Sequence, residues 1–327
     1  MVMPANLPPQ YYEAEEAYRE ASTPEEKLAA LEEMLAVMPK HKGTDKLQAD
    51  IKKRISNVKE EKEKKAKKKS TYNPYRFERM GAGQIILLGY PNTGKSSILA
   101  ALTNAKVEVA HYPFATSLPV AGMVPYDNIQ IQLIDTPPLV PEDVPGQLIG
   151  AIQAADFPVI VISAASDRCL EQLSGTLEFL EEKRIVREEI PEGVSAFKAE
   201  DLMVIATGID EKKAADNLEV VEEFFPEINI IPVSPTADIN MAELPEIFFN
   251  KLGIIRIYSK APGKEPEYDS PFTMPEGSTV LEFAREVHKD FADNLEKACV
   301  WGSAKFPGQP VARDFVLADQ DTVELHA

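Results

Sequence analysis

The residues with the greatest potential for chemistry lie in one short run, residues 89–96, which read GYPNTGKS. The run fits the pattern G-x-x-x-x-G-K-S, whose glycines let the backbone wrap phosphate groups with its N–H donors. The lysine would reach the outer phosphates, and the serine hydroxyl would bind Mg²⁺. The alternative is a glycine-rich turn with a surface lysine. The candidate phosphate-binding residues are Gly89, Asn92, Thr93, Gly94, Lys95, Ser96 and Ser97.

Three further polar sites follow apolar runs. Asp135 comes directly after residues 129–134, where a carboxylate can hold Mg²⁺, although a lone aspartate there is more often a turn residue or a helix cap. In the run Thr207-Gly208-Ile209-Asp210, Asp210 could accept hydrogen bonds from both N1–H and N2–H₂ of guanine, which adenine cannot offer. Its alternative role is the N-cap of the next helix. The backbone of Ser234 and Pro235 could meet the base, but this signal is weak by itself.

Strands and helices must alternate to position these residues. Short apolar runs typical of buried parallel strands lie at 84–89, 129–134, 157–164, 202–207 and 228–233. Helical patterns lie between them, at 95–102, 147–154, 170–183 and 211–223. This alternation predicts an α/β domain of the P-loop NTPase type, with a parallel sheet and helices on both faces.

The regions on either side of this domain have different patterns of expected secondary structure. Thr23, Pro24 and Glu26 form a helix start signal (N-cap, N1 and N3), and a second helical pattern follows Thr44. After residue 253 a small α+β module is expected, with strands at 255–258 and 271–274, a helix at 279–288 and a last strand at 323–326. The predicted organisation is a helical region at 1–80, the nucleotide domain at 81–253 and the small domain at 254–327.

Charge is distributed unevenly along the 327 residues. The net charge is −18, yet residues 40–79 hold 15 Lys or Arg against 6 Asp or Glu. Such a basic helix on an acidic body suggests a surface for RNA or an acidic partner, or else a solvated helix without a partner. No signal peptide, membrane span or metal-like cysteine spacing is visible, and a cytoplasmic protein with two reduced cysteines is expected.

The order and spacing of these motifs resemble the Drg branch (developmentally regulated GTP-binding proteins) of the Obg-like GTPases, from about residue 44 onwards. Residues 112–124, YPFATSLPVAGMV, resemble switch I of the group, and the resemblance makes Thr116 a residue for Mg²⁺ and the γ-phosphate. With Lys95, Thr116 is the expected catalytic residue, and Ser96, Thr116 and Asp135 are the expected metal ligands. The later runs GSTVLEFAREVHKDF and VWGSAKFPGQPV resemble a TGS domain.

The resemblance implies GTP and GDP as ligands, Mg²⁺ as cofactor, ribosome or RNA binding through the TGS domain and the basic helix, a possible protein partner, and no membrane. Asn92 matches an asparagine that some related GTPases use to help bind K⁺; its alternative role is to cap the loop backbone.

The chain departs from the group's pattern at several positions. Where the group has DxPG, this chain has DTPP, and Pro138 has no N–H to offer the γ-phosphate. Thr207 and Gly208 replace the Asn and Lys of NKxD, and Pro235 replaces an alanine. Leu139 stands where Ras-like enzymes hold a water-orienting glutamine. The small domain that eukaryotic members carry inside the nucleotide domain has no room between residues 167 and 202.

Two functions remain open from the sequence. One is a slow Mg²⁺-dependent GTPase that acts as a switch in ribosome-associated or RNA-associated work. The other is a nucleotide-stabilised adaptor that binds RNA or the ribosome without useful hydrolysis, which Pro138 and the TGID run keep open.

Overall fold

The computed structural model describes residues 8–21, 24–39, 44, 47–59, 73–103, 118–140, 144–191 and 196–326. Two compact units can be distinguished, residues 1–73 and residues 74–327. Each unit has hydrophobic cores of its own. The boundaries of the three domains expected from the sequence remain predictions.

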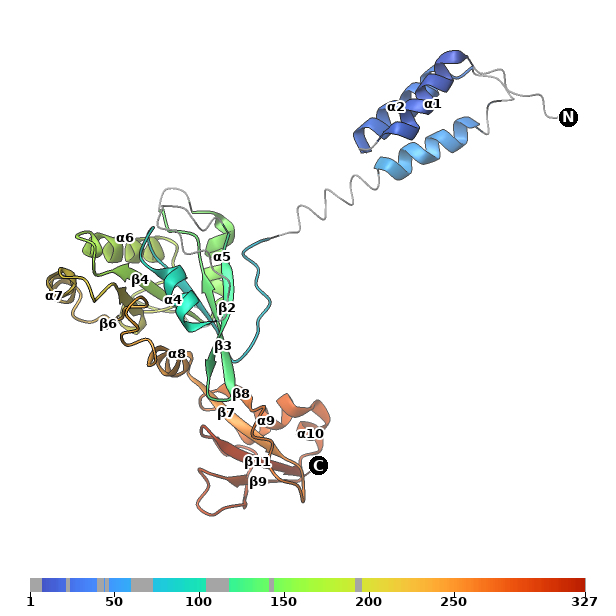
Figure 1. The fold of residues 1–327 in the computed structure, drawn as a ribbon. Helices are drawn as coiled ribbons and strands as arrows, with labels where there is room; N and C mark the ends of the chain where they lie inside the picture. Colours follow the sequence, from blue (N-terminus) through green and yellow to red (C-terminus); the bar gives the residue numbers. More distant parts are fainter. Residues whose placement is uncertain are drawn as a thin grey trace. The chain divides into compact units, whose positions relative to one another are not determined.

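The first unit is helical (Figure 1). It holds α1 (Pro9–Glu20), α2 (Pro24–Val37) and a helical segment at residues 47–59. Its small core is built from one apolar stripe of each helix: Tyr11, Ala14, Leu31, Met34, Met38 and Ile51. Before the third helical segment, the hydroxyl of Thr44 donates to the carbonyl of Pro39 at 2.6 Å. The predicted N-cap Thr23 lies outside the described residues.

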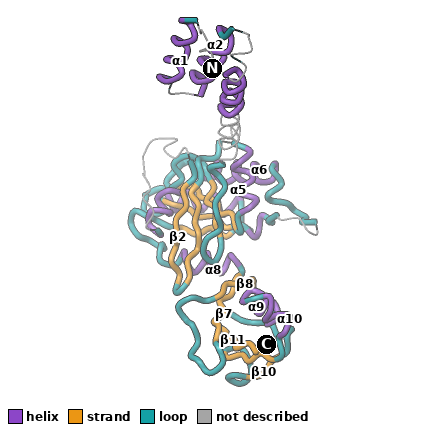
Figure 2. Tube along the Cα trace, turned by 90° about the vertical axis from the view of Figure 1, so that its right-hand side faces the viewer, coloured by secondary structure: helices purple, strands orange, loops and turns teal. Residues whose placement is uncertain are grey.

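A six-stranded sheet organises the nucleotide domain, in the order β2-β3-β1-β4-β5-β6 (Figures 1 and 2). Its strands are β1 (Gln84–Leu88), β2 (Val120–Tyr126), β3 (Ile129–Asp135), β4 (Phe157–Ser163), β5 (Met203–Thr207) and β6 (Asn229–Pro232). Neighbouring strands are parallel except β2, which pairs antiparallel with β3 from Val120 opposite Asp135 to Tyr126 opposite Ile129. The parallel sheet expected from the sequence therefore carries one antiparallel strand, β2, at its edge.

Helices cover both faces of this sheet, as expected. Alternate residues of β1 point to opposite faces, so that Ile86 lies in one core and Ile85 in the other. The first core is closed by α5 (Gly146–Ala154), α6 (Cys169–Glu182) and α7 (Ala214–Phe224). The second is closed by α4 (Lys95–Leu102) and α8 (Leu244–Leu252). The 3₁₀ helix η2 (Ala199–Asp201) precedes β5.

The C-terminal part is a second sheet with two helices on one side (Figure 2). The strand order is β10-β9-β11-β7-β8, with bounds β7 (Ile254–Lys260), β8 (Phe272–Pro275), β9 (Lys297–Trp301), β10 (Gln309–Val311) and β11 (Asp321–His326). Helices α9 (Val280–Val287) and α10 (Lys289–Asn294) pack on its core. Thr279 and Glu282 form a capping box at the start of α9, which explains why that helix begins there.

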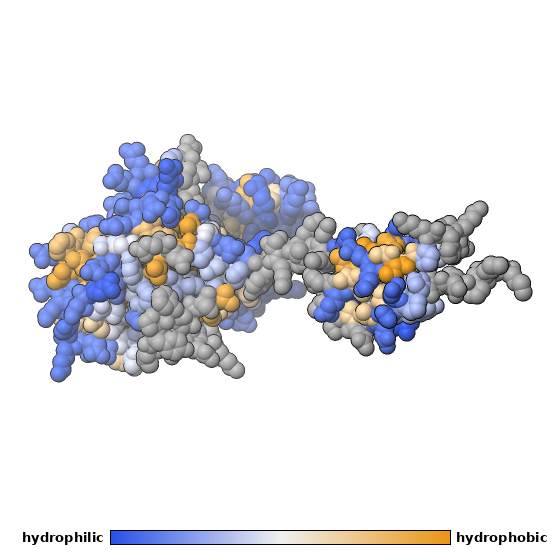
Figure 3. All heavy atoms as spheres, turned by 90° about the horizontal axis from the view of Figure 1, so that it is seen from above, coloured by the Kyte–Doolittle hydropathy of each residue, from blue (hydrophilic) through white to orange (hydrophobic). Residues whose placement is uncertain are grey.

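Exposed large apolar side chains are scattered over the described surface. They include Tyr12, Met80, Phe224, Tyr268 and Phe306, which belong to different elements. Figure 3 shows mostly hydrophilic residues on the face it presents, with apolar ones in small groups. Among the described residues, no helix is both long and apolar enough to cross a bilayer. Both cysteines, Cys169 and Cys299, are buried and unpaired by disulfide.

Candidate functional site

The loop between β1 and α4 has the backbone that a phosphate cradle needs. Gly94 adopts a left-handed conformation (φ +88°) as the N-cap of α4, and a Cβ there would approach Thr207 Oγ1 to 2.9 Å. A Cβ at Gly89 would collide with the carbonyl oxygen of Val161. Asn92, which is exposed, also has a positive φ of 61°. The loop therefore depends on glycine at both glycine positions of its pattern.

Lys95 is folded onto its own loop. Its Nζ donates to the carbonyl oxygens of Gly89 at 2.8 Å and Tyr90 at 2.9 Å, and the residue is only 5% exposed. Burial lowers the pKa of Lys95 to about 8, and the negative charge of Asp135 opposes that shift. A phosphate group would replace neutral carbonyl acceptors with a charged one, which is the stronger partner for an ammonium group.

Ser96 and Asp135 meet beside this lysine. The Ser96 hydroxyl donates to Asp135 Oδ2 at 2.5 Å, and Asp135 is fully buried at the end of β3. Its Oδ1 has no hydrogen-bond partner among the described residues. Burial raises the pKa of Asp135, while the Ser96 hydrogen bond and Lys95 act in the other direction. A buried carboxylate oxygen without a partner, beside a hydroxyl, fits a hard cation such as Mg²⁺.

Thr207 ties the strand that carries the TGID run to the phosphate loop. Its hydroxyl lies 2.8 Å from the carbonyl of Thr93 and 3.3 Å from that of Ile162, both acceptors. Thr207 and Thr93 are both buried. The structure thus gives Thr207 a supporting contact with protein. Ser97 is half-buried in the first turn of α4.

The other two predicted loops lie side by side. The backbone N–H of Ile209 donates to the carbonyl of Val233 at 3.5 Å, which joins the loop after β5 to the loop after β6. Asp210 is exposed there, whereas Ser234 is buried and its Oγ accepts from the Ala237 N–H at 3.0 Å. Pro235 is half-buried. The site residues after β1, β3, β5 and β6 accordingly share the carboxyl edge of one sheet, where open α/β sheets bind ligands.

The run after β3 is held beside β1 by two hydrogen bonds. Thr136 donates through Oγ1 to the carbonyl of Leu87 at 2.7 Å, and the Leu139 N–H donates to the carbonyl of Gly89 at 2.9 Å. The Leu139 side chain is fully buried in the hydrophobic core. Pro138 lies between these two anchors. Thr116, the expected switch I residue, lies outside the described residues.

Sequence reasoning missed one support of the loop. A Cβ on Gly175, in the middle of α6, would overlap the hydroxyl of Tyr90 and lie 3.2 Å from its Cζ. The glycine therefore gives the tyrosine of the phosphate loop room against the helix. The available signal was a glycine inside a helical pattern, which costs helix stability and so indicates a packing reason.

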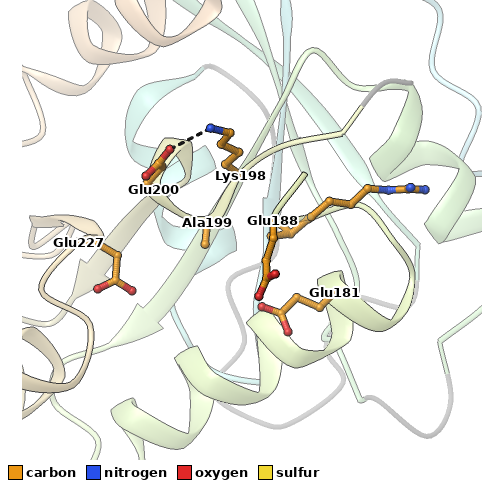
Figure 4. Close-up of a pocket in the computed structure, with 8 residues that line it drawn as sticks. Glu181, Glu188, Lys198, Ala199, Glu200 and Glu227 are labelled. Carbon is orange, nitrogen blue, oxygen red and sulfur yellow. Dashed lines mark hydrogen bonds and ion pairs between the residues drawn. The ribbon is translucent and has the colours of Figure 1, made fainter. Parts of the chain in front are cut away.

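A carboxylate-rich pocket of about 330 Å³ lies at the opposite edge of the sheet. Figure 4 shows Glu181, Glu188, Glu200 and Glu227 around it, with Lys198 paired to Glu200 at 3.3 Å. Its residues lie at the end of α6, after α6, or before β5 and β6, so they are remote from the carboxyl ends of the strands. No group of three or more potential metal ligands occurs among the described side chains.

Comparison with known families matches two parts of the chain. Residues 84–191 match the family described as 50S ribosome-binding GTPase, and residues 255–327 match the TGS domain. A structure of the Schizosaccharomyces pombe YchF GTPase superposes with a TM-score of 0.51 at 14% identity, covering 76% of this chain and 99% of that one. The expected P-loop GTPase fold and TGS domain are thus confirmed.

Curated relatives align over most of the chain. A GTP-binding protein of Methanocaldococcus jannaschii is 28% identical over 92% of this chain and 92% of its own. Ribosome-interacting GTPase 1 of Saccharomyces cerevisiae is 23% identical over 93% of this chain and 99% of its own. Developmentally-regulated G-protein 1 of Arabidopsis thaliana is 23% identical over 92% of this chain and 90% of its own.

Proposed function

We propose that this chain, a homologue of Drg-family GTP-binding proteins over most of its length, binds GTP and GDP and hydrolyses GTP slowly with Mg²⁺. The observation that carries the proposal is the meeting of Lys95, Ser96 and Asp135 at the carboxyl edge of the sheet. One cation, one hydroxyl and one carboxylate with a partnerless oxygen match the needs of a magnesium-nucleotide phosphate group.

Each residue of the loop then has a defined task. Lys95 leaves the carbonyls of Gly89 and Tyr90 and binds the outer phosphates, where its charge offsets the negative charge that develops in phosphoryl transfer. Ser96 and Asp135, with Thr116, would hold Mg²⁺, which supplies further positive charge to the phosphate oxygens. Glycine at 89 and 94 lets the backbone N–H groups approach the phosphates.

Guanine is the proposed base, with weak selectivity. Asp210 is exposed at the loop after β5, where its carboxylate is available to the N1–H and N2–H₂ donors of guanine. The loop after β6, with Ser234 and Pro235, lies next to it and would border the base. Gly208 offers no side chain where NKxD proteins carry a lysine, so this chain has fewer groups with which to discriminate between bases.

Slow hydrolysis follows from the run after β3. The Leu139 side chain is buried in the core, so it cannot orient a water molecule, and its N–H already donates to Gly89. Pro138 has no N–H. These same observations favour the second candidate function, an adaptor that nucleotide stabilises but that hydrolyses little. K⁺ bound near Asn92 would supply charge that the protein side chains do not.

Ribosomes or RNA are the proposed partners in the cytoplasm. The helical segment 47–59 exposes Lys52, Lys53 and Arg54, and these belong to the basic stretch at 40–79. A cationic helix of this kind binds phosphate backbones with a strong salt dependence. The TGS domain is the second proposed contact.

Single-turnover hydrolysis tests the proposal. Purified protein would be mixed with GTP, with and without Mg²⁺, K⁺ and ribosomes, beside a Lys95→Ala control. Slow, Mg²⁺-dependent phosphate release that the control lacks supports the GTPase. Binding without turnover in every condition selects the adaptor, and failure of the wild type to bind GTP or GDP rejects both. Lys95→Ala should weaken binding by several kcal/mol at most, since charged hydrogen bonds contribute about 1.5–3 kcal/mol each.

A further inference from the structure

The β2–β3 hairpin connects the nucleotide site with the TGS domain. At one end of this two-stranded ribbon Val120 pairs with Asp135, the carboxylate beside Ser96. At the other end Tyr126 pairs with Ile129, and the turn between them consists of Asp127 and Asn128. Seven residues in each strand make the ribbon roughly 20 Å long at about 3.3 Å per residue. The hairpin is therefore a continuous hydrogen-bonded connection between the turn and the site.

Arg256 of β7, in the TGS domain, binds this turn through an ion pair. The guanidinium group donates to Asp127 Oδ2 at 2.7 Å and makes a two-point contact with Asp319, at 3.1 and 2.7 Å. It lies 4.9 Å from the ring centroid of Phe249 and 5.5 Å from that of Tyr126. The Arg256 side chain is only 4% exposed, whereas the side chain of its partner Asp127 is 60% exposed.

Asn128 makes the second contact of the turn. Its Nδ2 donates to the Tyr258 hydroxyl at 3.0 Å and to the Tyr268 carbonyl at 2.7 Å. Its Oδ1 is buried and has no hydrogen-bond partner among the described residues. A buried acceptor without a donor costs free energy, so this contact is not at its optimum. The contact between the turn and the TGS domain therefore contains an unsatisfied polar group.

We propose that Arg256 is a positioning residue through which the TGS domain holds the β2–β3 hairpin and thereby sets the nucleotide preference of the P-loop site. The inference rests on the proposed nucleotide-binding function. Arg256 acts through Asp127 and the hairpin on Asp135. Whatever binds the TGS domain and moves β7 would change nucleotide affinity, and by thermodynamic reciprocity the bound nucleotide would change that partner's affinity.

Asp127 is the position at which to test this coupling. Asp127→Gly removes the carboxylate and suits the positive φ of 47° at this turn position. Asp127→Asn keeps a neutral acceptor and should retain part of the effect. Asp319 still neutralises Arg256 in both variants, so the TGS domain should stay folded. Glu200→Gln is the matched control, because it neutralises another exposed carboxylate paired with a cation, in η2 before β5 rather than in the hairpin.

The experiment measures dissociation of fluorescent GDP and of a fluorescent non-hydrolysable GTP analogue from the full chain. Asp127→Gly should change the ratio of the two dissociation rates by about fivefold or more, in line with typical allosteric couplings, and Asp127→Asn should change it less. The control should match the wild type. A wild-type ratio in Asp127→Gly, even with a lowered unfolding midpoint, overturns the inference and assigns Arg256 a structural role.

Hydrogen exchange supplies an independent readout. In the wild type, replacing GDP with the GTP analogue should alter protection of residues 254–260, and Asp127→Gly should abolish that difference. Identical exchange with both nucleotides in the wild type would contradict the coupling. If the wild type binds neither nucleotide, the proposed function itself fails, and this result is distinct from normal binding with an unaltered ratio.

Discussion

Replacing Thr207 with valine tests whether the strand that carries the TGID run supports the phosphate loop. Valine fills the same volume but lacks the hydroxyl that reaches the carbonyl of Thr93 at 2.8 Å and that of Ile162 at 3.3 Å. A neutral hydrogen bond contributes about 1 kcal/mol net, and leaving a buried carbonyl without its donor costs about 1–3 kcal/mol. We therefore expect a loss of about 1–3 kcal/mol in the free energy of unfolding.

Part of that loss should appear in nucleotide affinity. Without the Thr207 hydroxyl the phosphate loop is less well held, so binding of GDP must order it again. An ordering cost of about 1–2 kcal/mol corresponds to a 5–30-fold weaker affinity for GDP. Calorimetric titration of Thr207→Val against wild type measures it, with denaturant unfolding of both proteins measured in parallel. Thr207→Ser, which keeps the hydroxyl, should bind GDP almost as the wild type does.

Thr176 provides the matched control. It is also fully buried, but its hydroxyl donates to the carbonyl of Gln172 within α6, at 2.7 Å. Thr176→Val should lower stability without weakening GDP binding, because no atom of the phosphate loop loses a partner. Equal GDP affinity in Thr207→Val and Thr176→Val would refute the supporting role that we assign to Thr207.

Four further predictions concern the site. Below pH 8 Lys95 is charged both in the free protein and with nucleotide bound. Above its pKa of about 8 the free protein must take up a proton when it binds GDP, so GDP affinity should fall as the pH rises from 8 to 10. Calorimetry in buffers of different ionisation enthalpy detects this proton uptake. Asp210→Asn should lose its preference for GTP and gain affinity for XTP in competition binding, and a wild type indifferent to the base would contradict the guanine assignment. Pro138→Gly restores an N–H donor, so the GTP-over-GDP affinity ratio should rise about tenfold or more, whereas an unchanged ratio would mean that the γ-phosphate does not contact this segment. Gly175→Ala should displace the Tyr90 side chain and weaken GDP binding severalfold, and combining it with Tyr90→Phe should restore binding; failure of that rescue would exclude the overlap as the cause.

Local patterns predicted most of the elements that position the candidate nucleotide site. The run 89–96 contains both glycines, the lysine and the serine within one loop, and the apolar runs on either side fixed the strand β1 and the helix α4. Asp135 could be placed because parallel strands bring their carboxyl ends to one edge. The predicted strand at 129–134 differs from β3 by a single residue at its end.

Contacts between distant segments were not predictable. The hydroxyl of Thr207 binds a carbonyl 114 residues away, and Arg256 binds a carboxylate 129 residues away. No residue type at either end specifies such a partner. Strand β2 escaped prediction because its sequence VAGMVPY contains glycine and proline, which sheets tolerate at an edge such as this one. The burial of Leu139 in the core depends on the path of the chain after β3, which composition does not determine.

The position of β11 affects how the TGS domain forms during synthesis. Residues 321–326 lie in the middle of the sheet, parallel to β7 on one side and antiparallel to β9 on the other. Until they have been made, β7–β8 and β9–β10 have no strand to join them, and each pair leaves an unpaired edge open to other chains. The helical unit at residues 1–73 rests on contacts within its own short segment and can fold early. Loss of the last strand would therefore leave an aggregation-prone product whose N-terminal unit is already folded.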